Sequence, residues 1–211
     1  MRMAILVLGA LTAGECRRAP AEDFAPRASS APSAKGDPAA SATPEPARTA
    51  AVPAELEGRC VRPTPAEPPP AVAPGPAAGC PADPENGGAP LREVTVRFPL
   101  GGQTVRAEVA VSPQQTERGL MYRKSMAEDH GMLFDLRTRS DHEFWMHNTC
   151  IPLDLLYVDT DGLIVGIVEN APTLDDSPRS VHCPSRYVLE VNAGWSRRHG
   201  VKAGQQMSIP L

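Results

Sequence analysis

The chain from residue 91 onward opens with strict alternation of apolar and polar residues. Val94, Val96 and Phe98 are separated by polar neighbours, and the alternation returns over residues 105–111 after the turn sequence PLGGQ. A period of two residues is typical of a strand with one buried face. We therefore expect these two runs to form a β-hairpin.

Two short helices are expected beside the strands. Ser112 fits an N-cap, Pro113 the first helical position and Gln115 the return partner of a capping box, which predicts a helix to about residue 121. Asn192 could cap a second helix over residues 194–199. Gly200 suits the left-handed position that ends it.

Short apolar runs fill the rest of this part of the chain, with a hairpin turn at residues 159–162. They predict strands at residues 132–136, 143–147, 153–158, 163–168 and 187–191, and a closing strand at 206–209. Many short strands with little helix favour a mostly β class. We expect a single compact β-sandwich or barrel-like domain with one or two short helices.

Composition divides the chain near residue 90. Of the 24 prolines, 17 lie at or before Pro90, and every aromatic residue except Phe24 lies after it. A segment so poor in large apolar residues cannot offset the entropy of ordering. We therefore expect a disordered Ala/Pro-rich tether over residues 17–90 and a mostly β domain over residues 91–211.

The first 16 residues are typical of an export signal. Arg2 is followed by a short apolar run, by small residues and by Cys16. The pattern resembles a bacterial lipoprotein signal, in which the cysteine is lipidated, although Glu15 stands where that motif has a small residue. Cleavage elsewhere, for example after Ala21, is the alternative. Both predict an exported protein that is either periplasmic or a membrane-anchored lipoprotein.

Four cysteines remain if Cys16 is lipidated or removed. Two local pairs, Cys60 with Cys80 and Cys150 with Cys183, are the simplest of the three connectivities, although sequence alone does not choose among them. Buried free cysteines are the competing interpretation for Cys150 and Cys183. Disulfides would agree with an oxidising compartment.

One dense stretch, residues 118–154, carries a family resemblance. Its blocks RGLMYR, GMLF, FWMHNT and IPLD resemble the signature of family 192 of the domains of unknown function, and the tail VLEVNAGWSRRHGVKAGQ is similar to that family as well. The resemblance covers about residues 91–211 and implies a mostly β fold. It implies no reaction and no catalytic residue. His147 departs from the family pattern, which usually has lysine there.

The polar loop at residues 148–154 is the candidate binding site. Asp154 could pair with Arg118 or Arg123 as a buried bracket that pins the loop. Alternatively, the loop is one wall of a small polar pocket that suits a sugar or a small carboxylate. The candidate ligand-binding residues are Arg118, Arg123, Trp145, Asn148, Thr149 and Asp154.

Catalytic and metal chemistry find little support in the sequence. Asp154 with Glu143 is the only carboxylate pair worth considering. Met121, Met146 and neighbouring histidines could hold Cu(I), but methionine more commonly fills core gaps beside aromatic rings. We predict no metal, no cofactor and no catalytic residue, and leave enzymatic activity open while leaning against it.

Charge narrows the range of partners. The net charge is -4 and no basic stripe is visible, which disfavours nucleic acid. We expect a monomer that contacts a membrane only through a lipid anchor. The favoured function is a binding module for a small polar ligand or envelope glycan. The alternatives are a structural or partner-interaction protein of the envelope, a hydrolase-type enzyme and a copper-binding protein.

Overall fold

The computed structural model describes residues 56–211. The expected signal at residues 1–16, the lipidation of Cys16 and the tether up to residue 55 lie outside the described residues.

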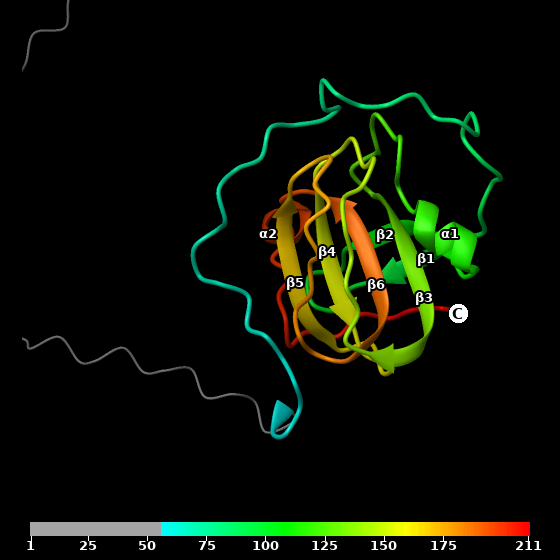
Figure 1. Ribbon diagram of the computed structural model, residues 1–211. Helices are drawn as coiled ribbons and strands as arrows, with labels where there is room; N and C mark the ends of the chain where they lie inside the picture. Colours follow the sequence, from blue (N-terminus) through cyan, green and yellow to red (C-terminus); the bar gives the residue numbers. More distant parts are fainter. Residues whose placement is uncertain (1–55) are drawn as a thin grey trace, which may run out of the picture. The chain divides into compact units, whose positions relative to one another are not determined.

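Residues 56–211 form one open sheet of six strands and two short helices (Figure 1), which confirms the mostly β class. The strand order is β1-β2-β3-β6-β4-β5, and every neighbouring pair is antiparallel except β2 with β3. The strands are β1 (Glu93–Arg97), β2 (Thr104–Ala110), β3 (His130–Ser140), β4 (Leu153–Val158), β5 (Ile164–Ala171) and β6 (Ser185–Asn192).

Local sequence signals place several elements correctly. The hairpin β1–β2 forms as predicted, and Gly162, at a φ of 88°, completes the turn between β4 and β5. Helix α1 (Pro113–Arg118) begins with the predicted capping box, in which Ser112 and Gln115 exchange side-chain to backbone bonds. It ends at Arg118, three residues earlier than expected, because Gly119 has a φ of 46°.

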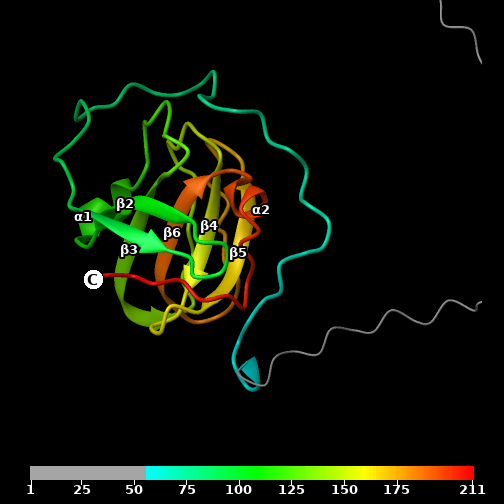
Figure 2. The ribbon, with the colours of Figure 1, turned by 180° about the vertical axis from the view of Figure 1, so that it is seen from behind.

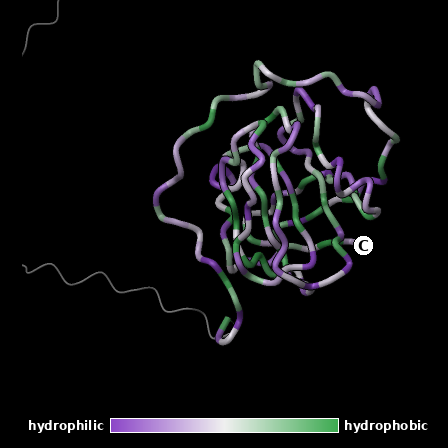
Figure 3. The backbone as a smooth tube through the Cα atoms, in the orientation of Figure 1, coloured by the Kyte–Doolittle hydropathy of each residue, from purple (hydrophilic) through white to green (hydrophobic). Residues whose placement is uncertain are grey.

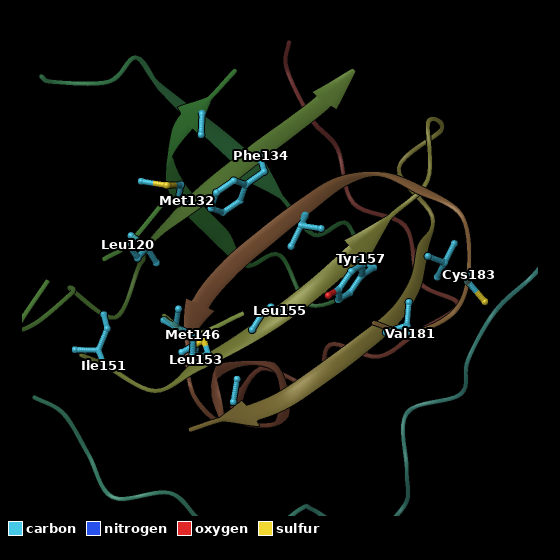
Figure 4. Packing of buried hydrophobic residues seen from close by; sticks show 14 of the residues in the cluster. Leu120, Met132, Phe134, Met146, Ile151, Leu153, Leu155, Tyr157, Val181 and Cys183 are labelled. Carbon is cyan, nitrogen blue, oxygen red and sulfur yellow. The ribbon is translucent and has the colours of Figure 1, made fainter. Parts of the chain in front are cut away.

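Both faces of the sheet are buried, which explains why every residue of β4 is buried and why all of them except Asp154 are hydrophobic. One core cluster includes Phe134, Leu155 and Tyr157 (Figure 4). The second lies on the other face and includes Phe98 and Trp195, whose rings are 5.2 Å apart. The most hydrophobic stretches accordingly lie within the sheet and its flanking loops (Figure 3).

The segment after helix α2 (Trp195–Arg198) runs across the sheet to the C-terminus (Figure 2). On its way Gln206 bridges Leu163, which precedes β5, and Ser208 bridges Arg97 of β1. The predicted closing strand is therefore present only as isolated bridges. The predicted N-cap of α2 was also wrong. Gly194, not Asn192, occupies the N-cap position, and no side chain of residues 56–211 caps the helix.

The predicted strand at residues 143–147 does not form. The alternation is present, since Met146 is buried while Trp145 and His147 are exposed. The backbone, however, pairs with a loop instead of the sheet: Phe144 exchanges two hydrogen bonds with Arg179, and the Met146 N–H donates to Asp175. Periodicity reports burial on one side, and it does not say which partner supplies the hydrogen bonds.

Residues 56–90, here called the strap, lie against the domain, so the expected tether does not describe them. The Arg62 N–H donates to the Val165 carbonyl, and the Arg197 guanidinium donates to three strap carbonyls, among them that of Pro65 at 2.8 Å. Arg59 pairs with Asp159 and Asp161. These contacts and two disulfides hold a Pro-rich segment that has too few apolar residues to form a core of its own.

All four cysteines of the described part are disulfide-bonded, but the expected pairing was wrong. The bonds join Cys60 to Cys183 and Cys80 to Cys150, with Cα–Cα distances of 5.4 and 5.3 Å. Cys150 precedes β4 and Cys183 precedes β6, and these strands are antiparallel. The two cysteines therefore lie at opposite ends of paired strands, about 20 Å apart along them, beyond the reach of a disulfide.

Two disulfides are typical of a protein that folds in an oxidising compartment. Within residues 56–211, no helix combines the length and the apolar character that a membrane crossing requires.

Candidate functional site

A pocket of about 440 Å³ opens beside helix α1, and we call it the Glu190 pocket. Its walls come from α1 and the turn that follows it, from β3, and from the loop between β3 and β4. They are completed by residues of the 172–184 loop and by Glu190 of β6. Its lining residues are Thr116, Glu117, Arg118, Gly119, Leu120, Met121, Phe134, Leu136, His142, Glu143, Phe144, Trp145, Thr149, Asp176, Pro178 and Glu190.

Glu190 is the most unusual residue of this pocket. It lies in the centre of the sheet, opposite Met132 of β3 and Leu155 of β4, and is 4% exposed. None of residues 56–211 makes a hydrogen bond or an ion pair with its carboxyl group, and burial raises its pKa to about 8. A buried carboxyl without a partner is uncommon in native proteins.

Aromatic rings form the inner wall. Phe144 packs edge-to-face on Phe134 at 5.1 Å and on Tyr157 at 6.0 Å between ring centroids. The Tyr157 hydroxyl donates to the Arg179 carbonyl at 2.7 Å, and burial raises its pKa. Gly119 leaves room for this wall, because a Cβ there would lie 3.2 Å from the Phe134 ring. The inner wall is therefore closely packed and mostly apolar.

Charged groups surround the mouth of the pocket. Glu117 and Glu143 are exposed, and Asp176 holds His147 through a 2.7 Å contact. Arg118 is the only arginine on the lining, and it is engaged by the strap: its Nη2 donates to both oxygens of Asp83 at 2.8 and 2.7 Å, and its Nη1 lies 3.1 Å from Glu85. Asp83 raises the pKa of this guanidinium.

Three of the six predicted binding residues, Arg118, Trp145 and Thr149, line the Glu190 pocket. Asn148 adopts a φ of 52° and donates from its amide to the Tyr122 hydroxyl at 3.0 Å, so it holds the turn after α1. Arg123 forms a bidentate pair with Glu108 and lines a separate pocket of about 380 Å³.

Asp154 does not join this group, and the expected bracket with Arg118 or Arg123 was wrong. Its carboxylate is fully buried and accepts three backbone N–H groups, from Asn170 and Gly194 at 2.9 Å and from Ser196 at 3.0 Å. In β4 it pairs with Val191, so its side chain lies on the face of the sheet opposite to Glu190. Asp154 therefore anchors the entry to α2.

The methionine and histidine residues considered for copper do not form one cluster: Met121 and His142 line the Glu190 pocket, whereas the other methionines pack in the core. Met132 and Met146 are buried in the core cluster beside Phe134. His130 contacts Asp129, and His142 contacts Ser140. Within residues 56–211 no group of three His, Cys, Asp or Glu residues is arranged as metal ligands. These positions favour core packing for the methionines.

Glu190 was not among the predicted site residues, because it lies outside the polar loop at residues 148–154. A signal was present in the sequence YVLEVN. Alternation puts Tyr187, Leu189 and Val191 on one face and Val188, Glu190 and Asn192 on the other. A lone acid between apolar residues on both faces of a strand would have indicated a buried carboxyl, but only if the strand had been recognised as central.

Two solved structures resemble this chain. One, from Sinorhizobium meliloti 1021 and described provisionally as a transcription regulator, is 41% identical, with a TM-score of 0.55; the match covers 57% of this chain and 96% of that one. The other, a protein of unknown function from Novosphingobium aromaticivorans DSM 12444, is 32% identical, also with a TM-score of 0.55; the match covers 64% of this chain and 95% of that one. No curated protein matches.

The family model of domain of unknown function 192, described as "Uncharacterized ACR", matches residues 96–209. This range includes all six strands of the sheet except the first residues of β1. It also includes every residue that lines the Glu190 pocket. With more than half of the chain matched, the protein belongs to the DUF192 family.

Proposed function

We propose that this domain is a binding module for a small polar ligand, which could be part of an envelope glycan, and that the ligand occupies the Glu190 pocket. The observation that carries the proposal is the unpartnered carboxyl of Glu190 inside a largely apolar pocket. A pocket with aromatic walls and a few polar groups is the usual form of a small-molecule site. Trp145, 51% exposed at the rim, offers a stacking surface for a sugar ring.

A purely structural role explains Glu190 less well. The Glu190 carboxyl faces the pocket and is held out of bulk water without a protein hydrogen bond, which costs about 1 kcal/mol or more, whereas an apolar residue at this position would pack without that cost. A ligand that bonds to the carboxyl would offset the cost only when bound. Because a bound ligand would explain a carboxyl that the fold itself does not need, Glu190 favours the binding module over the structural or partner-interaction alternative.

A hydrolase-type enzyme is the second candidate. The Glu143 carboxyl lines the same pocket as Glu190 and is exposed, while Glu190 is buried with a raised pKa. Two carboxyls in contrasting environments suit a general acid and a general base. Turnover of a bound glycoside that is lost in both Glu143→Gln and Glu190→Gln would favour this candidate over simple binding.

The proposed location is the cell envelope, either periplasmic or anchored through Cys16. The two disulfides and the signal-like sequence of residues 1–16 support it. Metabolic labelling with a radioactive fatty acid tests the anchor: label is expected on the wild-type protein and not on Cys16→Ser. An unlabelled, freely released wild-type protein would favour cleavage elsewhere.

A thermal-shift screen of the protein with both disulfides intact tests the function. The panel holds envelope sugars, small amines, small carboxylates and nucleotides. A ligand at 100 times its Kd adds about 2.7 kcal/mol, enough to raise the Tm by a few degrees. The shift should shrink in Thr149→Val and Glu190→Gln and persist in Glu93→Gln, whose side chain lines neither of the two pockets described above. A panel with no shift would count against the binding module.

A further inference from the structure

Resting on the proposed function, we infer that the Glu190 pocket takes a ligand that carries a protonated amine, which is held by the Glu190 carboxylate and by the aromatic wall. The inference concerns the ligand class of the same pocket. It rests on the charges of the lining, on the occupied hydrogen-bond donors and on the rings around Glu190.

The first argument is the charge of the lining. Four carboxyl groups line the pocket, those of Glu117, Glu143, Asp176 and Glu190, against a single arginine and one histidine. The arginine, Arg118, is already neutralised by Asp83 and Glu85 of the strap. Even while Glu190 is protonated, the carboxylates of Glu117, Glu143 and Asp176 make the field of the pocket negative. A negative concave site concentrates cations and repels carboxylates and phosphates. The small-carboxylate option of the sequence analysis is therefore disfavoured.

The second argument is the state of the donors. An anion needs hydrogen-bond donors aimed into the pocket, yet Arg118 donates to Asp83, and the Thr149 hydroxyl donates to the His147 carbonyl at 3.3 Å. Glu190, by contrast, has two acceptor oxygens and no partner among residues 56–211. An ammonium group supplies up to three donors and a positive charge. It satisfies the group that the fold leaves unsatisfied.

The third argument is the aromatic surface. Phe134, Phe144 and Trp145 all line the pocket. The face of an aromatic ring attracts a cation, and the attraction is stronger where water is excluded. Rings beside a carboxylate are the combination that favours an amine with an apolar body over a neutral alcohol of the same shape.

Binding must also release a proton. Burial raises the pKa of Glu190 to about 8, so its carboxyl is mostly protonated at pH 7. The amine arrives as a cation and keeps its own proton, while the Glu190 proton leaves to solvent, which gives the ion pair its carboxylate. The other ionisable groups facing this space are those of Glu117, Glu143, Asp176, Arg118 and His142, with Tyr157 behind the wall. Up to one proton should therefore leave per amine bound.

Isothermal titration calorimetry with three matched probes tests the inference. Benzylamine, benzyl alcohol and benzoate share one ring and differ in the polar group. Each is titrated at pH 7 into the oxidised protein, in two buffers of different ionisation enthalpy. We expect benzylamine to bind at least 10-fold more tightly than benzyl alcohol, benzoate to bind more weakly than either, and benzylamine alone to release a proton.

Glu190→Gln is the decisive variant, with Glu93→Gln as the matched control on β1. The amide keeps the shape and removes the charge. Benzylamine affinity should fall at least 10-fold and its proton release should vanish, while benzyl alcohol binding and the control remain unchanged. Circular dichroism and the unfolding midpoint verify that the variant folds. If Glu190→Gln does not fold, the wild-type protein still tests the inference, through its proton release and through the ratio of its affinities for benzylamine and benzyl alcohol.

The outcomes separate this inference from the proposed function. Equal affinity for benzylamine and benzyl alcohol, or tighter binding of benzoate, would overturn the amine assignment and leave a small-ligand pocket. Amine binding without proton release, or unaffected by Glu190→Gln, would place the amine elsewhere. If none of the three probes and nothing in the thermal-shift panel binds, both proposals fail.

Discussion

Two carboxyl groups lie in the middle of the same sheet, and the fold treats them in opposite ways. Asp154 of β4 and Glu190 of β6 belong to neighbouring register pairs on opposite faces, and both are buried. Asp154 accepts three backbone N–H groups. Glu190 accepts none from residues 56–211 and lines a pocket. Burial alone therefore does not say what a carboxylate is for.

Asp154 and Glu190 show how a structural buried acid is distinguished from a functional one. A buried carboxylate with its acceptor capacity filled by backbone is part of the fold, and removing it leaves unsatisfied donors. A buried carboxyl without partners lowers the stability of the folded state and is explained more easily by what it binds. Three measurements test this contrast between Asp154 and Glu190.

The largest effect is expected for Asp154→Ala. The change leaves three backbone N–H groups without their charged acceptor, and a hydrogen bond to a charged group contributes about 1.5–3 kcal/mol. We expect a loss of about 4 kcal/mol in the free energy of unfolding, measured by urea denaturation. Asp154→Asn should lose less. The exposed Asp129→Ala serves as control and should change little. If Asp154→Ala is as stable as the wild type, Asp154 does not have the structural role assigned to it.

The next effect concerns the strap. Cys80–Cys150 attaches it beside Thr149 of the Glu190 pocket. Near Asp154 its contacts are hydrogen bonds instead: the Asn170 amide donates to the Pro70 carbonyl, and the Arg197 guanidinium donates to the carbonyls of Pro65, Ala66 and Glu67. The paired change Cys80→Ser with Cys150→Ser should lower stability by about 3 kcal/mol. Hydrogen exchange should speed up more at residues 144–151 than at 192–196. Equal changes in both regions would mean that the strap supports them alike.

The third effect is a dependence on pH. Glu190 has a folded pKa of about 8 against an ordinary value of 4.5. Between these values the unfolded chain has lost the proton and the folded protein keeps it, so this group lowers stability as the pH rises. The contribution of Glu190 to the free energy of unfolding should fall by about 2 kcal/mol between about pH 6 and pH 8. The difference in the free energy of unfolding between Glu190→Gln and the wild type, measured against pH, isolates the contribution of Glu190. If this difference does not change with pH, the Glu190 carboxyl is not in an unpartnered, buried state.

Much of the fold was predictable from local patterns. The β1–β2 hairpin, the turn at Gly162 and the capping box of Ser112 and Gln115 formed as expected, because a few adjacent residues carry their whole physical cause. The family blocks also marked the right neighbourhood, since Arg118, Trp145 and Thr149 line one pocket. Asn148 and Arg123 proved to support it from nearby.

Local sequence patterns were enough to locate the six strands of the sheet, the turn at Gly162 and the cap of α1, and to indicate the family. Only the tertiary structure decided which distant groups meet. Strand order put Cys150 and Cys183 at opposite ends of β4 and β6 and made the strap their partner. It also turned Asp154 towards backbone donors and left Glu190 facing a pocket. Partners of this kind depend on long-range register, which no local pattern of residues specifies.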